Sequence, residues 1–151
     1  MTSHSDDEGS LPTPVAPDGW RPGRGYAHAL LGRGRLLAIS GQVGWDPATE
    51  VFASDEFAAQ ADQAFANIVA VLRAAGGKPE HIVRLTWFIT DRVEYLDSRA
   101  ALGAAYRTRF GRHYPAMSVV VVRALLEPRA KLEIEATALL PDSETAASDS
   151  F

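Results

Sequence analysis

Residues 57–90, FAAQADQAFANIVAVLRAAGGKPEHIVRLTWFIT, combine a helix pattern with a strand pattern and decide the fold. Apolar residues recur at helical spacing through the first half: Phe57, Ala61, Ala64, Phe65, Ile68, Val71, Leu72 and Ala75. Gly76 and Gly77, followed by Pro79, end this helix. The second half, residues 81–90, is rich in β-branched and aromatic residues, which favour a strand. The stretch therefore predicts a helix that leads directly into a strand.

Further strands and a second helix surround this unit. Residues 26–40 contain two short apolar segments on either side of Gly32-Arg33-Gly34, a pattern typical of a hairpin. Asp97 or Ser98 opens a second helix, and Gly111 closes it. Residues 118–126 and 131–140 predict two final strands. The resulting order is ββαβαββ, which predicts an α+β fold with both helices on one face of a single sheet.

The other face of this sheet needs a cover of its own. The run from Val119 to Val122 is apolar on both faces of its strand. A sheet with helices on one side only would leave such residues in water, so we expect the free face to self-associate. In the last strand, Glu133, Glu135 and Thr137 share the face opposite Leu132 and Ile134.

Composition bounds the class of protein. The chain has 151 residues, 46% of them hydrophobic and 23% charged, which predicts one globular domain. We expect this domain to span residues 20–140, between disordered tails at 1–19 and 141–151, which are polar and lack apolar periodicity. The net charge of −4 does not favour a nucleic-acid partner, and the absence of cysteine excludes disulfides and thiolate chemistry.

The same reading favours a cytoplasmic protein. No apolar run approaches the roughly 20 residues of a membrane span, and the N-terminus MTSHSDDEGS has neither the basic start nor the apolar core of a signal peptide. No phosphate-cradling loop, nucleophile elbow or pair of histidines at metal-ligand spacing is present. Local motifs therefore predict neither a cofactor nor a metal.

Several residues allow two interpretations. Glu133 and Glu135 are either solvated carboxylates or groups that act on water in a partly dry cleft. Tyr26 and His28 share a strand face and are either locally hydrogen-bonded or part of a site. Trp45, in a glycine-containing loop, either walls a ligand pocket or covers the core.

Four segments resemble the RidA/YjgF family in order and spacing: SGQVGWDPATE, AAQADQAFANIVAVLRAAGGKPEHIVRLTWFITD, YPAMS and KLEIEATA. The resemblance covers about residues 26–140. It implies a chorismate-mutase-like α+β fold and a homotrimer with a barrel-like core and three clefts between subunits. It also implies hydrolysis of reactive enamine or imine acids to keto acids and ammonia, without a metal or cofactor.

The resemblance places candidate site residues one by one. Tyr26 stands at the tyrosine of the family's GPYSQ segment, and Ser40, Gly41 and Gln42 form its SGQ segment. Gly41 would offer a backbone group to the ligand. Glu133 stands at the acidic residue implied to hold the attacking water.

Three positions depart from the family pattern. Met117 replaces the arginine of the PAR segment, which grips the substrate carboxylate, while Gly103 replaces an asparagine and Val119 a small polar residue or cysteine. A charge-assisted hydrogen bond contributes roughly 1.5–3 kcal/mol, so its loss at position 117 changes which ligand binds. We therefore expect a deaminase for larger or less anionic imines, with Trp45 and Met117 as apolar walls. The alternative is a trimer that binds or regulates without catalysis.

Overall fold

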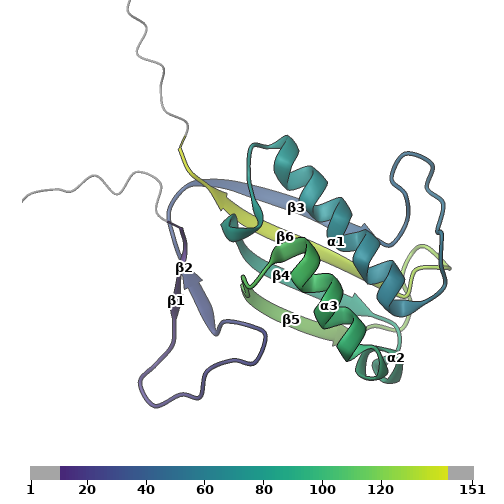
Figure 1. Cartoon of the computed structure of the whole chain (residues 1–151), viewed down its shortest axis with the longest axis horizontal. Helices are drawn as coiled ribbons and strands as arrows, with labels where there is room; N and C mark the ends of the chain where they lie inside the picture. The colour runs from purple at the N-terminus through teal and green to yellow at the C-terminus, as the bar shows by residue number, and fades with distance from the viewer. Residues whose placement is uncertain (1–10, 143–151) are drawn as a thin grey trace, which may run out of the picture.

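A four-stranded sheet carries all of the helices on one face (Figure 1). The computed structural model describes residues 11–142. In the order β3-β6-β4-β5, β6 is antiparallel to both of its neighbours and β4 is parallel to β5. The strands are β3 (Arg35–Val43), β6 (Leu132–Leu140), β4 (Ile82–Ile89) and β5 (Ala116–Val121). The predicted α+β architecture with the helices on one face of the main sheet is confirmed, whereas the prediction that all strands join a single sheet is wrong, because a separate two-stranded sheet is present.

The helices follow the predicted order, with one addition. They are α1 (Phe57–Ala74), the 3-10 turn η1 (Pro79–His81), α2 (Arg92–Asp97) and α3 (Arg99–Phe110). The apolar stripe of α1 is buried as predicted, except that Val71 is exposed and Val69 is buried in its place. The short helix α2 was not predicted from the sequence. Its first turn is capped by the Asp91 carboxylate, which accepts hydrogen bonds from the backbone N–H groups of Val93 and Glu94.

The predicted hairpin within residues 26–40 is wrong. Ala29–Leu31 forms β2, but β2 pairs with β1 (Thr13–Val15) in a separate two-stranded sheet. Strand β3 pairs with β6 instead, from Arg35 opposite Leu140 to Val43 opposite Glu133. The long ladder with the nine-residue strand β6 satisfies more backbone groups than pairing with a three-residue strand would.

Strand β1 lies inside the segment expected to be a disordered tail. Its three residues are exposed, and the antiparallel pairing with β2 is what orders them. Composition does not reveal such pairing because it depends on a partner strand distant in sequence. Residues 1–10 and 143–151 of the expected tails lie outside the described part of the chain.

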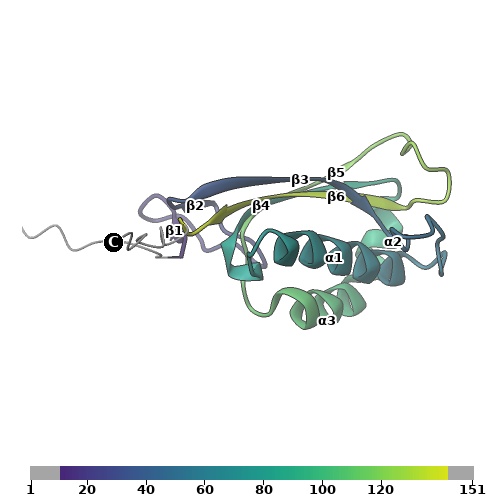
Figure 2. The same cartoon turned by 90° about the horizontal axis from the view of Figure 1, so that it is seen from above.

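Alternation along the central strands separates the buried face from the open face. In β6, Leu132, Ile134, Ala136 and Ala138 are buried under the helices, as predicted, and Glu133 and Glu135 lie on the other side. Within residues 11–142 no element covers that other side (Figure 2). Apolar residues are exposed on this open face, among them Leu36 and Val120. None of the helices in the described range is long and apolar enough to span a membrane.

Gln60 ties the start of α1 to two loops. This buried side chain donates through Nε2 to the backbone oxygens of Ser54 and Arg129, both at 3.0 Å, and its Oε1 accepts the N–H of Lys131 at 2.9 Å. It thereby fixes the loop that leads into β6 against the helix that covers β6.

Replacing Gln60 with leucine should destabilise the fold strongly, since it leaves three backbone groups without a partner. We expect Gln60→Leu to lower the free energy of unfolding by about 3 kcal/mol. Gln63→Leu, in the same helix, removes one hydrogen bond to Asn67 and should cost less than about 1 kcal/mol. Urea unfolding of both variants measures the difference, and equal losses would contradict this role of Gln60.

His81 is a buried titratable group at the end of η1. Its Nδ1 accepts the backbone N–H of Lys78 at 3.1 Å. Burial lowers the pKa of His81 below its ordinary value of 6.5, and the charge of Lys78 lowers it further against an opposing effect of Glu80. The folded protein therefore favours the neutral imidazole.

Stability should fall on acidification through His81. The unfolded chain takes up a proton at this residue near pH 6.5, and the folded protein does so only at lower pH, so unfolding binds a proton in that window. Above it the residue is neutral in both states and contributes no pH dependence. His81→Gln should lose stability less steeply than the wild type between about pH 7 and about pH 5. Identical slopes in denaturant unfolding would rule out this contribution.

Candidate functional site

The sheet divides the predicted site residues into two groups on opposite faces. Met117 is paired with Leu85, on the face that packs against the helices. Glu133 is paired with Phe88, on the open face. Since paired residues point to the same side of a sheet, the side chains of Met117 and Glu133 leave the sheet in opposite directions.

The first group lies at an irregularity of β3. The register between β3 and β6 shifts between Ile39 and Gln42, so Ser40 and Gly41 form a bulge. A Cβ placed on Gly41 would overlap Oε1 of Glu133 and would lie 2.7 Å from its Cδ. Only glycine allows the carboxylate to lie this close to the backbone of β3. Gln42 donates from Nε2 to the carbonyl oxygen of Ser40 at 3.2 Å and to its Oγ at 3.4 Å.

Glu133 is half-buried at this bulge. None of the side-chain hydrogen bonds or ion pairs found within residues 11–142 involves its carboxylate. Glu135, the next residue on the same face, is exposed. Glu133 is thus a carboxylate with open acceptor positions beside bare backbone, a group able to hold and deprotonate water.

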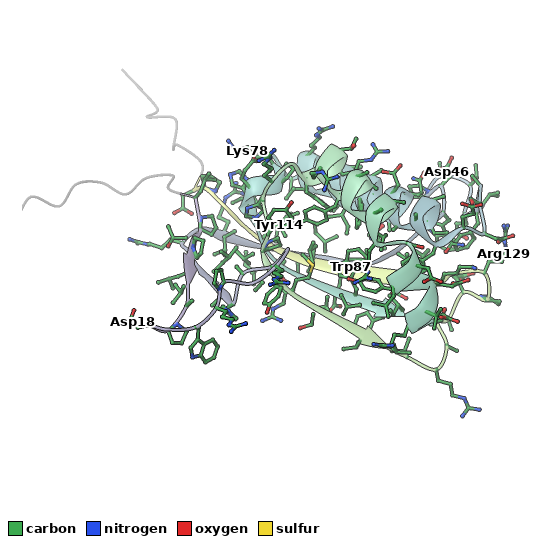
Figure 3. The ribbon with its side chains drawn as sticks, turned by 60° about the horizontal axis from the view of Figure 1, so that its bottom comes forward. Asp18, Asp46, Lys78, Trp87, Tyr114 and Arg129 are labelled. Atoms are coloured by element: carbon green, nitrogen blue, oxygen red, sulfur yellow. The ribbon has the colours of Figure 1, made fainter. Side chains whose placement is uncertain are left out.

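The second group lines a cavity between the helices and the β4–β5 half of the sheet. Its volume is about 190 Å³, and both Met117 and Gly103 contribute to its wall. Four aromatic residues form most of the remaining wall: Trp87, Tyr95, Tyr106 and Tyr114. Trp87 lies between the sheet and the helices (Figure 3). The cavity is therefore mainly apolar.

Tyr106 is a fixed part of this wall. Its hydroxyl donates to the carbonyl oxygen of His113 at 2.7 Å, and its ring stacks on Tyr114 at 5.4 Å between centroids. Burial raises the pKa of Tyr106, and the neighbouring Tyr114 raises it further. Its proton is committed to the backbone, so Tyr106 shapes the cavity and does not exchange a proton with a ligand.

Of the residues that line the cavity, Met117 and Gly103 were predicted as site residues; those not predicted include Arg24, Trp87 and Arg99. Arg99 had a usable signal, because it precedes Gly103 by one helical repeat and so shares its face of α3. Trp87 was read only as part of a buried strand. Arg24 has no local signal, since it reaches the cavity from the segment before β2.

The remaining predicted residues lie outside the cavity wall. Tyr26 is 41% exposed and packs edge-to-face on His28 at 5.5 Å. Trp45 packs on Phe52 in a second, smaller cluster, which is the core-covering alternative. Val119 lies on β5 beyond Met117 and is partly exposed at this sheet edge. No three His, Cys, Asp or Glu side chains of the described chain lie close enough to share a metal ion.

Comparisons with known proteins show the family of the chain. A family model described as "Endoribonuclease L-PSP" matches residues 18–140. The chain is 37% identical over 127 residues to a RutC family protein of Leuconostoc mesenteroides subsp. cremoris, covering 84% of this chain and 94% of the relative. It is 39% identical over 109 residues to the 2-iminobutanoate/2-iminopropanoate deaminase of Salmonella typhimurium, covering 70% and 80% of the two chains.

A solved structure shows the same relationship. The Rid family protein YyfB from Yersinia pestis superposes with a TM-score of 0.77 at 32% identity, covering 87% of this chain and all of that one. The chain belongs to the RidA/YjgF family. The fold predicted from the resemblance is therefore confirmed, and Met117, the residue predicted to replace the family's arginine, lies in the wall of the aromatic cavity.

Proposed function

We propose that this RidA/YjgF family member is a deaminase that hydrolyses reactive enamine or imine intermediates, with a substrate range different from that of its relatives. One observation carries the proposal: the Glu133 carboxylate lies against the bare backbone of Gly41 at the β3 bulge. The name of the Salmonella typhimurium relative, a 2-iminobutanoate/2-iminopropanoate deaminase, supports the reaction class.

The chemistry requires one group that accepts and returns a proton. Water adds to the carbon of the C=N bond while Glu133 takes one of its protons and passes it to nitrogen, which gives a neutral tetrahedral carbinolamine. Glu133 then takes the proton of the carbinolamine hydroxyl and delivers it to the same nitrogen, the C–N bond breaks, and ammonia leaves as the carbonyl compound forms. One water is consumed and the residue ends as it began, so no redox partner is needed. An enamine first tautomerises to the imine.

The two groups of site residues meet only if a second copy of the chain contributes. Glu133 and the cavity lie on opposite faces of one sheet, so a ligand in the cavity of one subunit cannot reach that subunit's own carboxylate through the sheet. A homotrimer with clefts between subunits brings the open face of one copy to the cavity of its neighbour. The uncovered face, with exposed Leu36 and Val120, supports this assembly.

The wall at Met117 supports a changed substrate range. Methionine gives no charge-assisted grip on a small carboxylate and adds a flexible apolar surface to an aromatic cavity. The alternative function is a trimer that binds a ligand or regulates without hydrolysis. Met117, Gly103 and Val119 favour it, because each would replace a polar residue of the family pattern.

Glu133 and its neighbour Glu135 provide a matched test. With imines generated in situ by an amino-acid oxidase, Glu133→Gln should lower kcat/KM by about 100-fold or more, because it removes the general base. Glu135→Gln, on the same face of β6, should stay within about threefold of the wild type. If no imine is hydrolysed faster than in buffer while ligands still bind, the non-catalytic alternative holds.

Mixed subunits test the location of the site. Gly103→Trp fills the cavity and Glu133→Gln removes the base, so each variant alone should be inactive. Coexpression of the two in equal amounts should restore about a quarter of the wild-type activity, because random assembly of a closed ring joins an intact cavity to an intact Glu133 in that fraction of clefts. No recovery in verified mixed oligomers would place the whole site within one chain.

A further inference from the structure

We propose that the cavity selects a small carboxylic acid with a planar aromatic side chain, whose carboxylate is held by Arg99, Arg24 and the indole N–H of Trp87. The corresponding substrates would be imines of aromatic amino acids, and this part of the inference rests on the proposed function. The binding of the acid rests on the cavity alone. Four features of the described residues support it: an unsatisfied donor, two arginines outside the ion pairs, a glycine in the wall and the aromatic residues around it.

Trp87 supplies the unsatisfied donor. The residue is 4% exposed, and within residues 11–142 its Nε1 is the one buried side-chain polar atom with no hydrogen-bond partner. The ring packs edge-to-face on Phe65 at 5.3 Å and on Tyr95 at 6.0 Å, so it cannot turn away from its position. A buried N–H without an acceptor is unfavourable. Trp87 contributes to the cavity wall but its Nε1 has almost no exposed surface, so a ligand oxygen reaches this N–H when the wall adjusts around the ligand.

Arg99 supplies a guanidinium with free donors. It begins α3, and its Nε donates to the carbonyl oxygen of Leu96 at 3.0 Å, which fixes the plane of the group. Neither Arg99 nor Arg24 takes part in the ion pairs of the described chain, and no Asp or Glu is in the described cavity wall. The terminal nitrogens of a guanidinium match a carboxylate in planar, paired geometry.

Gly103 lies between two arginines on one face of α3. Arg99, Gly103 and Arg107 succeed one another at four-residue intervals and so share that face. A Cβ on Gly103 would lie 3.2 Å from a terminal nitrogen of Arg107, so the Arg107 guanidinium lies close to the glycine. Gly103 itself adds no side chain to the cavity wall.

Arg24 reaches the cavity on a turn of the N-terminal segment. Gly25, the next residue, has a φ of 77°, a left-handed conformation that glycine adopts readily. The N–H of Ala27 donates to the carbonyl oxygen of Pro115 at 3.1 Å, and Ala27 forms a parallel bridge with Ala116. These contacts tie the turn to the start of β5, next to Met117.

The wall and volume define the rest of the ligand. About 190 Å³ is less than the roughly 300–1,000 Å³ of sites for drug-sized molecules, which favours a ligand of one ring and a short acid chain. Trp87, Tyr95, Tyr106 and Tyr114 offer edges and faces to a planar ring, and Met117 adapts to its outline. A cation at position 117 would occupy the space that the ring takes.

Binding is tested with unreactive acids on the full chain. The indole N–H signals of the three tryptophans are followed by ¹H–¹⁵N NMR during titration with 3-phenylpropionate, and Trp87→Phe assigns the signal of Trp87. The Trp87 signal should move downfield, and 3-phenylpropionamide and propionate should each bind at least about 10-fold more weakly. An unmoved Trp87 signal at saturation would overturn the proposal.

Variants separate the cations from general charge effects. Arg99→Gln should weaken 3-phenylpropionate binding by about 10-fold or more, and Arg99→Lys should recover part of it. Arg92→Gln, an exposed position of α2 outside the cavity wall, should bind as the wild type does. Equal affinity of Arg99→Gln and Arg92→Gln would overturn the role of Arg99.

Turnover separates this inference from the proposed function. The imine of phenylalanine should be hydrolysed with a higher kcat/KM than the imine of alanine, and Glu133→Gln should lose turnover while it retains 3-phenylpropionate binding. Hydrolysis without preference for the aromatic imine would overturn the substrate class and leave the deaminase standing. Binding of the acid with a shifted Trp87 signal but no hydrolysis of any imine would support the binding site and overturn the proposed reaction.

Discussion

The two-residue alternation of the central strands is the constraint on which the rest of the structure depends. Because β6 and β4 lie between other strands, every second side chain in them must pack under α1 and α3, and the residues between must face the other way. Ile134 in the core and Glu133 on the open face are consequences of the same geometry. The burial that stabilises the sheet therefore also fixes the direction of the carboxylate.

The bulge in β3 modifies this geometry at one place. In a regular ladder each residue of β3 would lie opposite one residue of β6, but Ser40 and Gly41 interrupt this pairing. Because Gly41 has no Cβ, the Glu133 carboxylate fits beside its backbone. The carboxylate is consequently held beside backbone instead of being screened by a neighbouring side chain. The cavity on the other face does not depend on a bulge. It forms because α3 packs mainly on α1, and large aromatic side chains lie between α3 and the strands β4 and β5.

The features predicted correctly from the sequence are those that depend on local periodicity. The stripe of α1 and the alternation of β6 are set by neighbours in the chain, and both were predicted in the right places. The hairpin failed because strand pairing depends on competing partners: β2 found Thr13–Val15, and β3 found β6. Family motifs pointed to Met117, Gly103 and Glu133; the structure brings Met117 and Gly103 to one cavity and places Glu133 on the opposite face of the sheet. Arg24 and Arg99 were not predicted, because tertiary packing alone brings these distant residues to one cavity.

The position of the positive charge in the cavity decides which ligand the cavity can bind. A cation at position 117 would project from β5 into the middle of the aromatic wall, where its distance from the rings is fixed by the sheet. Arg99 and Arg24 approach instead from a helix and a turn at the margin, so the charge remains available while the centre stays apolar. Desolvating a ring at that centre is favourable, whereas desolvating a guanidinium there without a partner is not. With Met117 at the centre of the wall and Arg99 and Arg24 at its margin, the site that we propose is built around an apolar group that carries an anion at its end.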